Sequence, residues 1–180
     1  MVILSAAKNP DAFSIAHTLL DFAHEPTSRT LNAMDSLTLH VGSGRLVSYS
    51  PLRELPWRVV FEDEGIAGYC YACDGRLATV EDEFDVTVLD SMLVYNVTAM
   101  RREPEGDRER LLTLEWSADG QQAALRLDGI PQVLVDFEKR ESYCRSNFPN
   151  FMQDSAAWRA TSHAWDESAM TRFEEALTKH

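Results

Sequence analysis

The sequence has few cysteines, few basic residues and no long hydrophobic run, and each shortage excludes a class of protein. Its 180 residues include three cysteines, an odd number that does not suit a disulfide framework in a chain of this size. No stretch approaches the roughly 18 apolar residues that a membrane-spanning helix needs. The opening M-V-I-L-S-A-A also lacks the basic leader of a signal peptide. We therefore expect a cytoplasmic protein with reduced thiols.

Basic residues are outnumbered by acidic ones. The chain has 17 Lys and Arg against 29 Asp and Glu, which gives a net charge of −12 and an isoelectric point near 4.8. Because phosphate contacts need Lys and Arg, this balance disfavours binding to nucleic acid or to an anionic membrane. The sequence instead predicts a basic protein partner, which the negative charge of the chain would attract. The alternative is that the charge only keeps the protein soluble.

Catalytic and cofactor motifs are missing as well. The sequence contains no G-x-S-x-G elbow, phosphate-binding loop, dinucleotide fingerprint or H-E-x-x-H zinc motif. His17 and His24 lie seven residues apart in one helical pattern, but no third ligand accompanies them. We predict no catalytic residue, no cofactor and no metal, and whether the chain is an enzyme stays open.

Helical patterns are confined to the two ends of the chain. Asn9 and Pro10 can begin a helix, and apolar residues recur at three- and four-residue spacing over 11–24. The tail from 150 to 178 has similar punctuation, with a last helix that opens at 166–168 and buries apolar side chains at 170, 173 and 177. We expect these helices to pack on one face of a sheet.

Between the helices the hydrophobic period changes to two, from about 36 to 138. Gly42, Ser43 and Gly44 are typical of a hairpin turn, and the polar segment 101–110 is typical of an exposed hairpin loop. The segment 84–98 is expected to form one strand, or two strands with a bend near Asp90 and Ser91. Strands are predicted at 36–41, 45–50, 56–63, 68–73, 84–98, 111–116, 123–127 and 133–137.

These patterns predict one α+β domain over residues 1–180. Strand follows strand through short turns, so the sheet should be a mostly antiparallel meander of about six to eight strands, with the N- and C-terminal helices packed on one face. The four tryptophans are expected to anchor its core. A homodimer formed through an edge strand or the helical face stays open.

Cys70 and Cys73 have the C-x-x-C spacing of a zinc site or a redox pair. On an extended strand, however, side chains an odd number of residues apart point to opposite faces. A redox C-x-x-C begins a helix, whereas the tyrosines at 69 and 71 and the following Asp74 and Gly75 favour a strand and then a turn. The sequence therefore predicts two structural thiols that share no metal.

Cys144 is the remaining thiol, and it lies between Tyr143 and Arg145. The charge of Arg145 would favour the thiolate, so these three residues are a candidate ligand site at the mouth of a cleft. A zinc site of three cysteines would also need a fourth ligand such as His40 or His163, and no spacing singles out either.

Acidic residues gather at two predicted turns, and they are candidates for contact with a basic partner. Neither cluster has the glycine and the ligand spacing of a calcium loop, so a solvated surface or a docking surface for cationic side chains is expected. The candidate residues are Glu62, Asp63, Glu64, Glu81, Asp82, Glu83 and Asp85.

Four stretches resemble a family of small bacterial proteins of unknown function, domain of unknown function 2251. They are F-E-D-E-G-I-A-G-Y-C-Y-A (61–72), L-V-Y-N-V (93–97), W-S-A-D-G-Q-Q-A-A-L (116–125) and D-F-E-K-R-E-S-Y-C-R-S-N-F-P (136–149). The resemblance covers about 56–149 and implies a shared fold, without catalytic residues that could be transferred. Many small acidic proteins of this type are immunity partners that neutralise a secreted toxin.

Two functions therefore remain. The first is a non-enzymatic binding module, such as an immunity-type inhibitor, whose carboxylates compete for the cationic cleft of a basic toxin. The second is a small-ligand-binding protein or enzyme with a cleft near Tyr143–Arg145.

Overall fold

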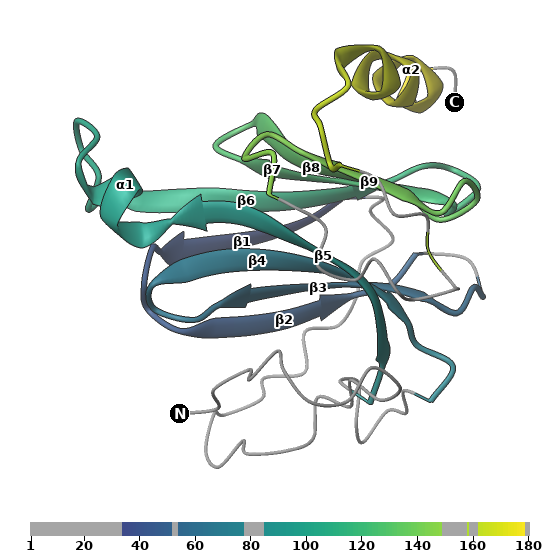
Figure 1. The fold of residues 1–180 in the computed structure, drawn as a ribbon, viewed down its shortest axis with the longest axis horizontal. Helices are drawn as coiled ribbons and strands as arrows, with labels where there is room; N and C mark the ends of the chain where they lie inside the picture. The colour runs from purple at the N-terminus through teal and green to yellow at the C-terminus, as the bar shows by residue number, and fades with distance from the viewer. Residues whose placement is uncertain (1–33, 52–53, 78–84, 149–157, 159–161, 179–180) are drawn as a thin grey trace.

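The chain forms two antiparallel sheets stacked face to face (Figure 1). The computed structural model describes residues 34–51, 54–77, 85–148, 158 and 162–178. One sheet has the strand order β2-β3-β4-β5, with β2 (Arg45–Tyr49), β3 (Trp57–Asp63), β4 (Ala67–Asp74) and β5 (Thr87–Asn96). The other has the order β1-β6-β7-β8-β9, with β1 (Met34–His40), β6 (Glu109–Trp116), β7 (Gln122–Leu127), β8 (Ile130–Asp136) and β9 (Glu141–Cys144).

Two helices accompany the sheets in the described residues. The short helix α1 (Val97–Arg101) follows β5, and Asn96 caps it by accepting a hydrogen bond from the Ala99 amide. The helix α2 (Glu167–Leu177) begins at Asp166, whose carboxylate accepts from the Ser168 and Ala169 amides. It packs on the outer face of the five-stranded sheet, and its buried side chains contact Ala124 and Leu134 (Figure 1).

The main core lies between the sheets, and it explains the continuous apolar runs of the sequence. On β3, Val59 and Phe61 point into this core, while Val60 belongs to a second apolar cluster on the outer face of the four-stranded sheet. On β8, Val133 and Val135 point inward and Leu134 lies under α2. Because both faces of these strands are buried, their sequences lose the polar alternation of a half-exposed strand.

The prediction of one sheet of six to eight strands is wrong, because nine strands form two sheets in the described residues. Gly42–Gly44 does not close a hairpin. β1 pairs with β6, for example Leu37 with Leu112, whereas β2 pairs with β3. The turn is instead a corner at which the chain leaves one sheet for the other, and a meander is present within β2–β5 and within β6–β9.

The predicted balance of helix and strand also needs correction. The two described helices have 5 and 11 residues, so the described part of the chain is predominantly β. The segment 101–110, predicted as a hairpin loop, instead takes the chain from one sheet to the other, between α1 and β6. The predicted start of the last helix is confirmed. The predicted helix 11–24 lies outside the described residues, as does nearly all of 150–161.

No helix in the described part of the chain has both the length and the apolar character needed to span a membrane.

Candidate functional site

Cys70 and Cys73 point to opposite faces of β4, as their spacing predicts. The Cys70 side chain belongs to the core between the sheets, and that of Cys73 belongs to the outer cluster with Val60 and Val88. Both are fully buried, and burial raises the pKa of each thiol above its ordinary value of 9.0. No group of three or more His, Cys, Asp or Glu side chains within the described ranges could hold a metal ion.

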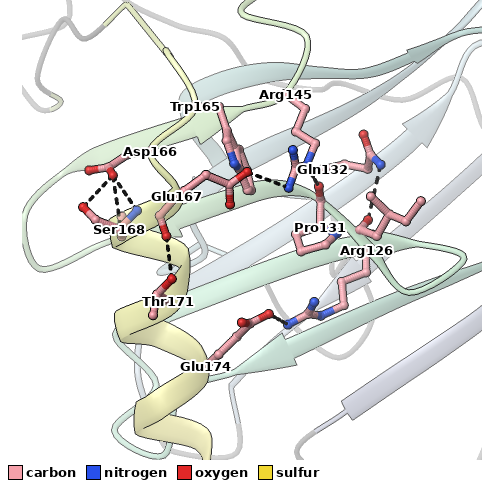
Figure 2. A network of polar contacts seen from close by, with 12 residues as sticks. Arg126, Pro131, Gln132, Arg145, Trp165, Asp166, Glu167, Ser168, Thr171 and Glu174 are labelled. Atoms are coloured by element: carbon pink, nitrogen blue, oxygen red, sulfur yellow. Dashed lines mark hydrogen bonds and ion pairs between the residues drawn. The ribbon is translucent and has the colours of Figure 1, made fainter.

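The side chains of the candidate ligand site, Tyr143, Cys144 and Arg145, also lie on different sides of the five-stranded sheet. Cys144 is fully buried in the core between the sheets. Tyr143 packs under α2, and its hydroxyl donates to Glu141 at 2.8 Å. Arg145 turns toward the start of α2, where it pairs with Glu167 (Figure 2). Neighbouring side chains on this strand thus serve two different layers of the fold.

Arg145 is engaged on three sides in the network that holds α2 to the sheet. Its guanidinium lies 4.4 Å from the centre of the Trp165 ring, is 3.1 Å from the Glu167 carboxylate and donates to the Pro131 carbonyl at 2.6 Å (Figure 2). A second arginine, Arg126, bridges Glu115 on β6 and Glu174 on α2. These arginines are therefore used in packing the helix.

A buried ionisable pair, His163 and Asp90, was not predicted as a site. Both side chains are fully buried, and the Nε2 atom of His163 lies 3.0 and 2.9 Å from the two carboxylate oxygens of Asp90. The other ring nitrogen, Nδ1, lies 2.8 Å from the Phe148 carbonyl oxygen. The signal in the sequence was Asp90 itself, an acid in the middle of the apolar run V-T-V-L-D-S-M-L-V.

The environment of His163 shifts its protonation. Burial alone lowers the pKa of His163, but the hydrogen bond and charge of Asp90, together with the Phe148 carbonyl, outweigh it and raise the pKa above its ordinary value of 6.5. Both ring nitrogens are occupied, so neither can take a proton from Cys144 or Ser146. In this arrangement the pair joins segments of the fold and does not activate a nucleophile.

Asp63, one of the predicted partner-binding acids, lies inside the fold. Its carboxylate accepts hydrogen bonds from the backbone amides of Gly42 at 2.6 Å and Gly65 at 2.7 Å, and from the Tyr95 hydroxyl at 2.9 Å. It thereby joins the β1–β2 corner, the β3–β4 turn and β5. With 2% of its surface exposed, it is not available to a partner.

The neighbouring acids Glu62 and Glu64 do reach the surface. Glu62 is half-buried and accepts a hydrogen bond from the Tyr71 hydroxyl at 2.9 Å. Glu64 is exposed, although part of its carboxylate is shielded from solvent. This shielding and, to a smaller extent, the charge of Glu62 raise the pKa of Glu64 above its ordinary value of 4.5. Within the described residues neither carboxylate forms an ion pair. Beside them, Ile66 is 72% exposed at the tip of the β3–β4 turn.

The remaining predicted acids do not join this group. Asp85 is exposed, but it precedes β5, whose first residue Thr87 aligns with Asp74 at the far end of β4. The β3–β4 turn lies at the other end of the same sheet. Glu81, Asp82 and Glu83 lie outside the described residues. The apex formed by Glu62, Glu64 and Ile66 is thus the described part of the predicted surface, and we call it the β3–β4 apex.

Comparisons with known proteins agree with the resemblance seen in the sequence. A family described as "uncharacterized protein conserved in bacteria", domain of unknown function 2251, matches residues 39–174. An uncharacterized protein of Haemophilus influenzae is 32% identical over 91 residues, which are 51% of this chain and 51% of that protein. The chain thus matches about half the length of this relative. No solved structure matches the chain.

Proposed function

We propose that this chain, which belongs to the bacterial family of domain of unknown function 2251, is a non-enzymatic protein-binding module that docks onto a basic partner through the β3–β4 apex. An immunity-type inhibitor of a basic toxin in the cytoplasm is the specific role that we infer.

The observation that carries this proposal is a rigid turn that presents an apolar side chain beside two carboxylates. Ile66 is the most exposed large hydrophobic side chain of the described residues. The buried Asp63 holds the turn through the Gly65 amide, and the Ile66 carbonyl accepts a hydrogen bond from the Val97 amide at 3.0 Å. A preorganised turn loses little conformational entropy on binding, so its contacts contribute more of their energy to affinity.

The electrostatics of the apex favour a cationic partner. Glu62 and Glu64 repel each other, and a Lys or Arg side chain placed between them would relieve this repulsion. The net charge of −12 would also speed the approach of a basic protein at low ionic strength. A nuclease toxin carries a cationic cleft that binds phosphate, and an acidic apex with an apolar tip could block such a cleft.

The buried polar groups support a binding role over catalysis. His163 has both ring nitrogens engaged, and the three thiols are fully buried. The alternative of a ligand site at Tyr143–Arg145 has less support, because Arg145 contacts Trp165 and Glu167 and lies in a different layer from Cys144.

Binding to the product of the adjacent gene tests the proposal. Association is measured at low and at physiological ionic strength for the wild type, for Ile66→Asp and for the double variant Glu62→Gln/Glu64→Gln. The glutamines keep an acceptor for Tyr71 and remove only charge. The matched control is Glu138→Gln/Glu175→Gln, which changes the net charge equally at two exposed positions away from the apex.

We expect each apex variant to weaken binding by about tenfold or more, with the charge variant acting mainly on the association rate at low salt. The control should stay within about twofold. If the two double variants weaken binding equally, the apex carboxylates act only through the net charge of the chain. If the apex variants bind with unchanged affinity, the apex is not the docking surface.

A further inference from the structure

We propose that His163 and Asp90 form a pH-sensitive latch, which holds the segment 162–178 with α2 against the sandwich while His163 is protonated and releases it when that proton is lost. This inference concerns a part of the molecule away from the β3–β4 apex and does not depend on the proposed function.

The positions of the acceptors determine where the protons must be. The Phe148 carbonyl can only accept, so the Nδ1 atom of His163 must carry a hydrogen. On the other side Nε2 faces both oxygens of Asp90. A neutral imidazole with its hydrogen on Nδ1 would point a lone pair at an ionised carboxylate. The pair therefore needs one further proton, and the latch places it on Nε2, where it forms an imidazolium that donates to Asp90.

Among the described residues, His163 is the one cationic group that forms an ion pair with Asp90. From β4 the titratable group that interacts with Asp90 is Cys70, and burial raises the pKa of its thiol, which keeps it neutral. From β9 the group is Cys144, whose sulfur lies 3.2 Å from the Ser146 hydroxyl. Arg145, which follows Cys144 in the chain, is turned outward to Trp165 and Glu167. Deprotonation would leave the Asp90 carboxylate unpaired in a buried site, which is costly.

The latch lies where the edges of the two sheets meet. Asp90 is on β5, at the edge of the four-stranded sheet, and the His163 carbonyl accepts a hydrogen bond from the Cys144 amide of β9 at 3.0 Å. Three residues after His163, Asp166 caps α2. The histidine thus anchors the start of the helical segment at a point that both sheets share.

Beyond the latch, the attachment of α2 is modest. Its buried contacts come from Ala169, Met170 and Phe173, and its ion pairs through Arg126 and Arg145 involve exposed glutamates. Exposed ion pairs contribute little to stability. A short helix held by one small apolar cluster can open without global unfolding. Its release would uncover Ala124, Leu134 and Tyr143 on the five-stranded sheet.

The direction of the pH effect follows from the raised pKa of His163. A group that binds its proton more tightly in the closed state stabilises that state fully at pH values below its ordinary pKa of 6.5. This contribution is lost as the pH rises through the higher value of the closed state. The latch is therefore closed in mild acid and opens toward alkaline pH.

Hydrogen exchange of the full-length chain tests the latch. Protection factors of the α2 amides of Met170 and Phe173 are compared with those of the β7 amides of Ala124 and Leu125 from about pH 6 to pH 9. Nitrogen NMR of the histidine side chains reports the protonation of His163 over the same range. Two variants are measured alongside the wild type, Asp90→Asn and the control His40→Gln.

His40 is a matched control because it also pairs with a carboxylate, Glu109 at 3.2 Å, but on the surface. In Asp90→Asn the amide can donate to a neutral Nε2, so the latch should stay closed without a second proton.

We expect α2 protection in the wild type to fall by up to about tenfold per pH unit above pH 6.5 while β7 protection stays constant. The fall should persist in His40→Gln and vanish in Asp90→Asn. A neutral His163 at pH 6.5, or parallel protection of α2 and β7 at every pH, would overturn the latch. So would an unchanged pH dependence in Asp90→Asn. If that variant does not fold, the wild-type measurements decide alone.

Discussion

Tyr95 on β5 donates a hydrogen bond of 2.9 Å to the buried carboxylate of Asp63 at the end of β3. The same carboxylate accepts from the amides of Gly42 and Gly65, which belong to two different turns. One charged side chain thus organises the end of the sandwich that presents Ile66. A carboxylate suits this place because it accepts hydrogen bonds at both oxygens.

The first prediction concerns this carboxylate. Asp63→Asn keeps the shape but turns an NH2 group toward a backbone amide, which leaves one buried donor unpaired. We expect a loss of about 2–3 kcal/mol in the free energy of unfolding, measured in urea. Tyr95→Phe removes a single donor and should cost about 1 kcal/mol. Asp85→Asn, at an exposed position, should stay within about 0.5 kcal/mol and is the control. Equal stability of Asp63→Asn and Asp85→Asn would contradict the role given to Asp63.

The second prediction separates close packing from backbone strain at two glycines. Gly42 and Gly129 have φ angles of 86° and 79°, so alanine is strained at both, by about 1–2 kcal/mol. A Cβ atom at Gly42 would also lie 3.1 Å from the Val97 and Arg101 side chains, whereas one at Gly129 would have nothing within 4 Å. We expect Gly42→Ala to lower the unfolding free energy by about 1–2 kcal/mol more than Gly129→Ala. Thermal and urea unfolding of both variants measure the difference, and equal losses would refute it.

The third prediction concerns the thiols. Cys70, Cys73 and Cys144 are all fully buried. A buried thiol reacts only after unfolding exposes it. A thiol reagent should therefore modify these cysteines at least about a hundredfold more slowly in the folded chain than in urea. Thr98→Cys, at an exposed position of α1, is the control and should react at once. Rapid labelling of a wild-type thiol, or a Cys70–Cys73 disulfide formed in the folded chain, would contradict the opposite orientations of their side chains.

Much of the local structure follows from the sequence alone. Each of the eight predicted strands overlaps an observed one, and the last helix begins where Asp166 predicted it. Of the two readings of the segment 84–98, one strand is correct, and its pairing with β4 shifts register between Ala72 and Cys73. The faces of Cys70 and Cys73 were also predictable, because alternation along a strand depends only on the residues of that strand.

The candidate site was harder to predict. The acidic surface was proposed from composition, but Asp63 proved to be buried and Asp85 lies at the other end of the sheet from Glu62. The sequence neighbours of Asp63 are exposed or half-buried acids, so only the donors that approach it from two turns and from β5 distinguish it. The small turn residues Gly42 and Gly65 could be noticed in the sequence, but not their common acceptor.

By itself the sequence determined where the backbone is extended, where the last helix begins and which way neighbouring side chains point. These properties depend on contacts between residues close in the chain and on the two-residue period of a strand. The tertiary structure decided that Gly42–Gly44 is a corner between two sheets and that β1 pairs with β6. It also decided that His163 meets Asp90, 73 residues away. Such pairings depend on which distant surfaces bury each other, and no local pattern encodes that choice.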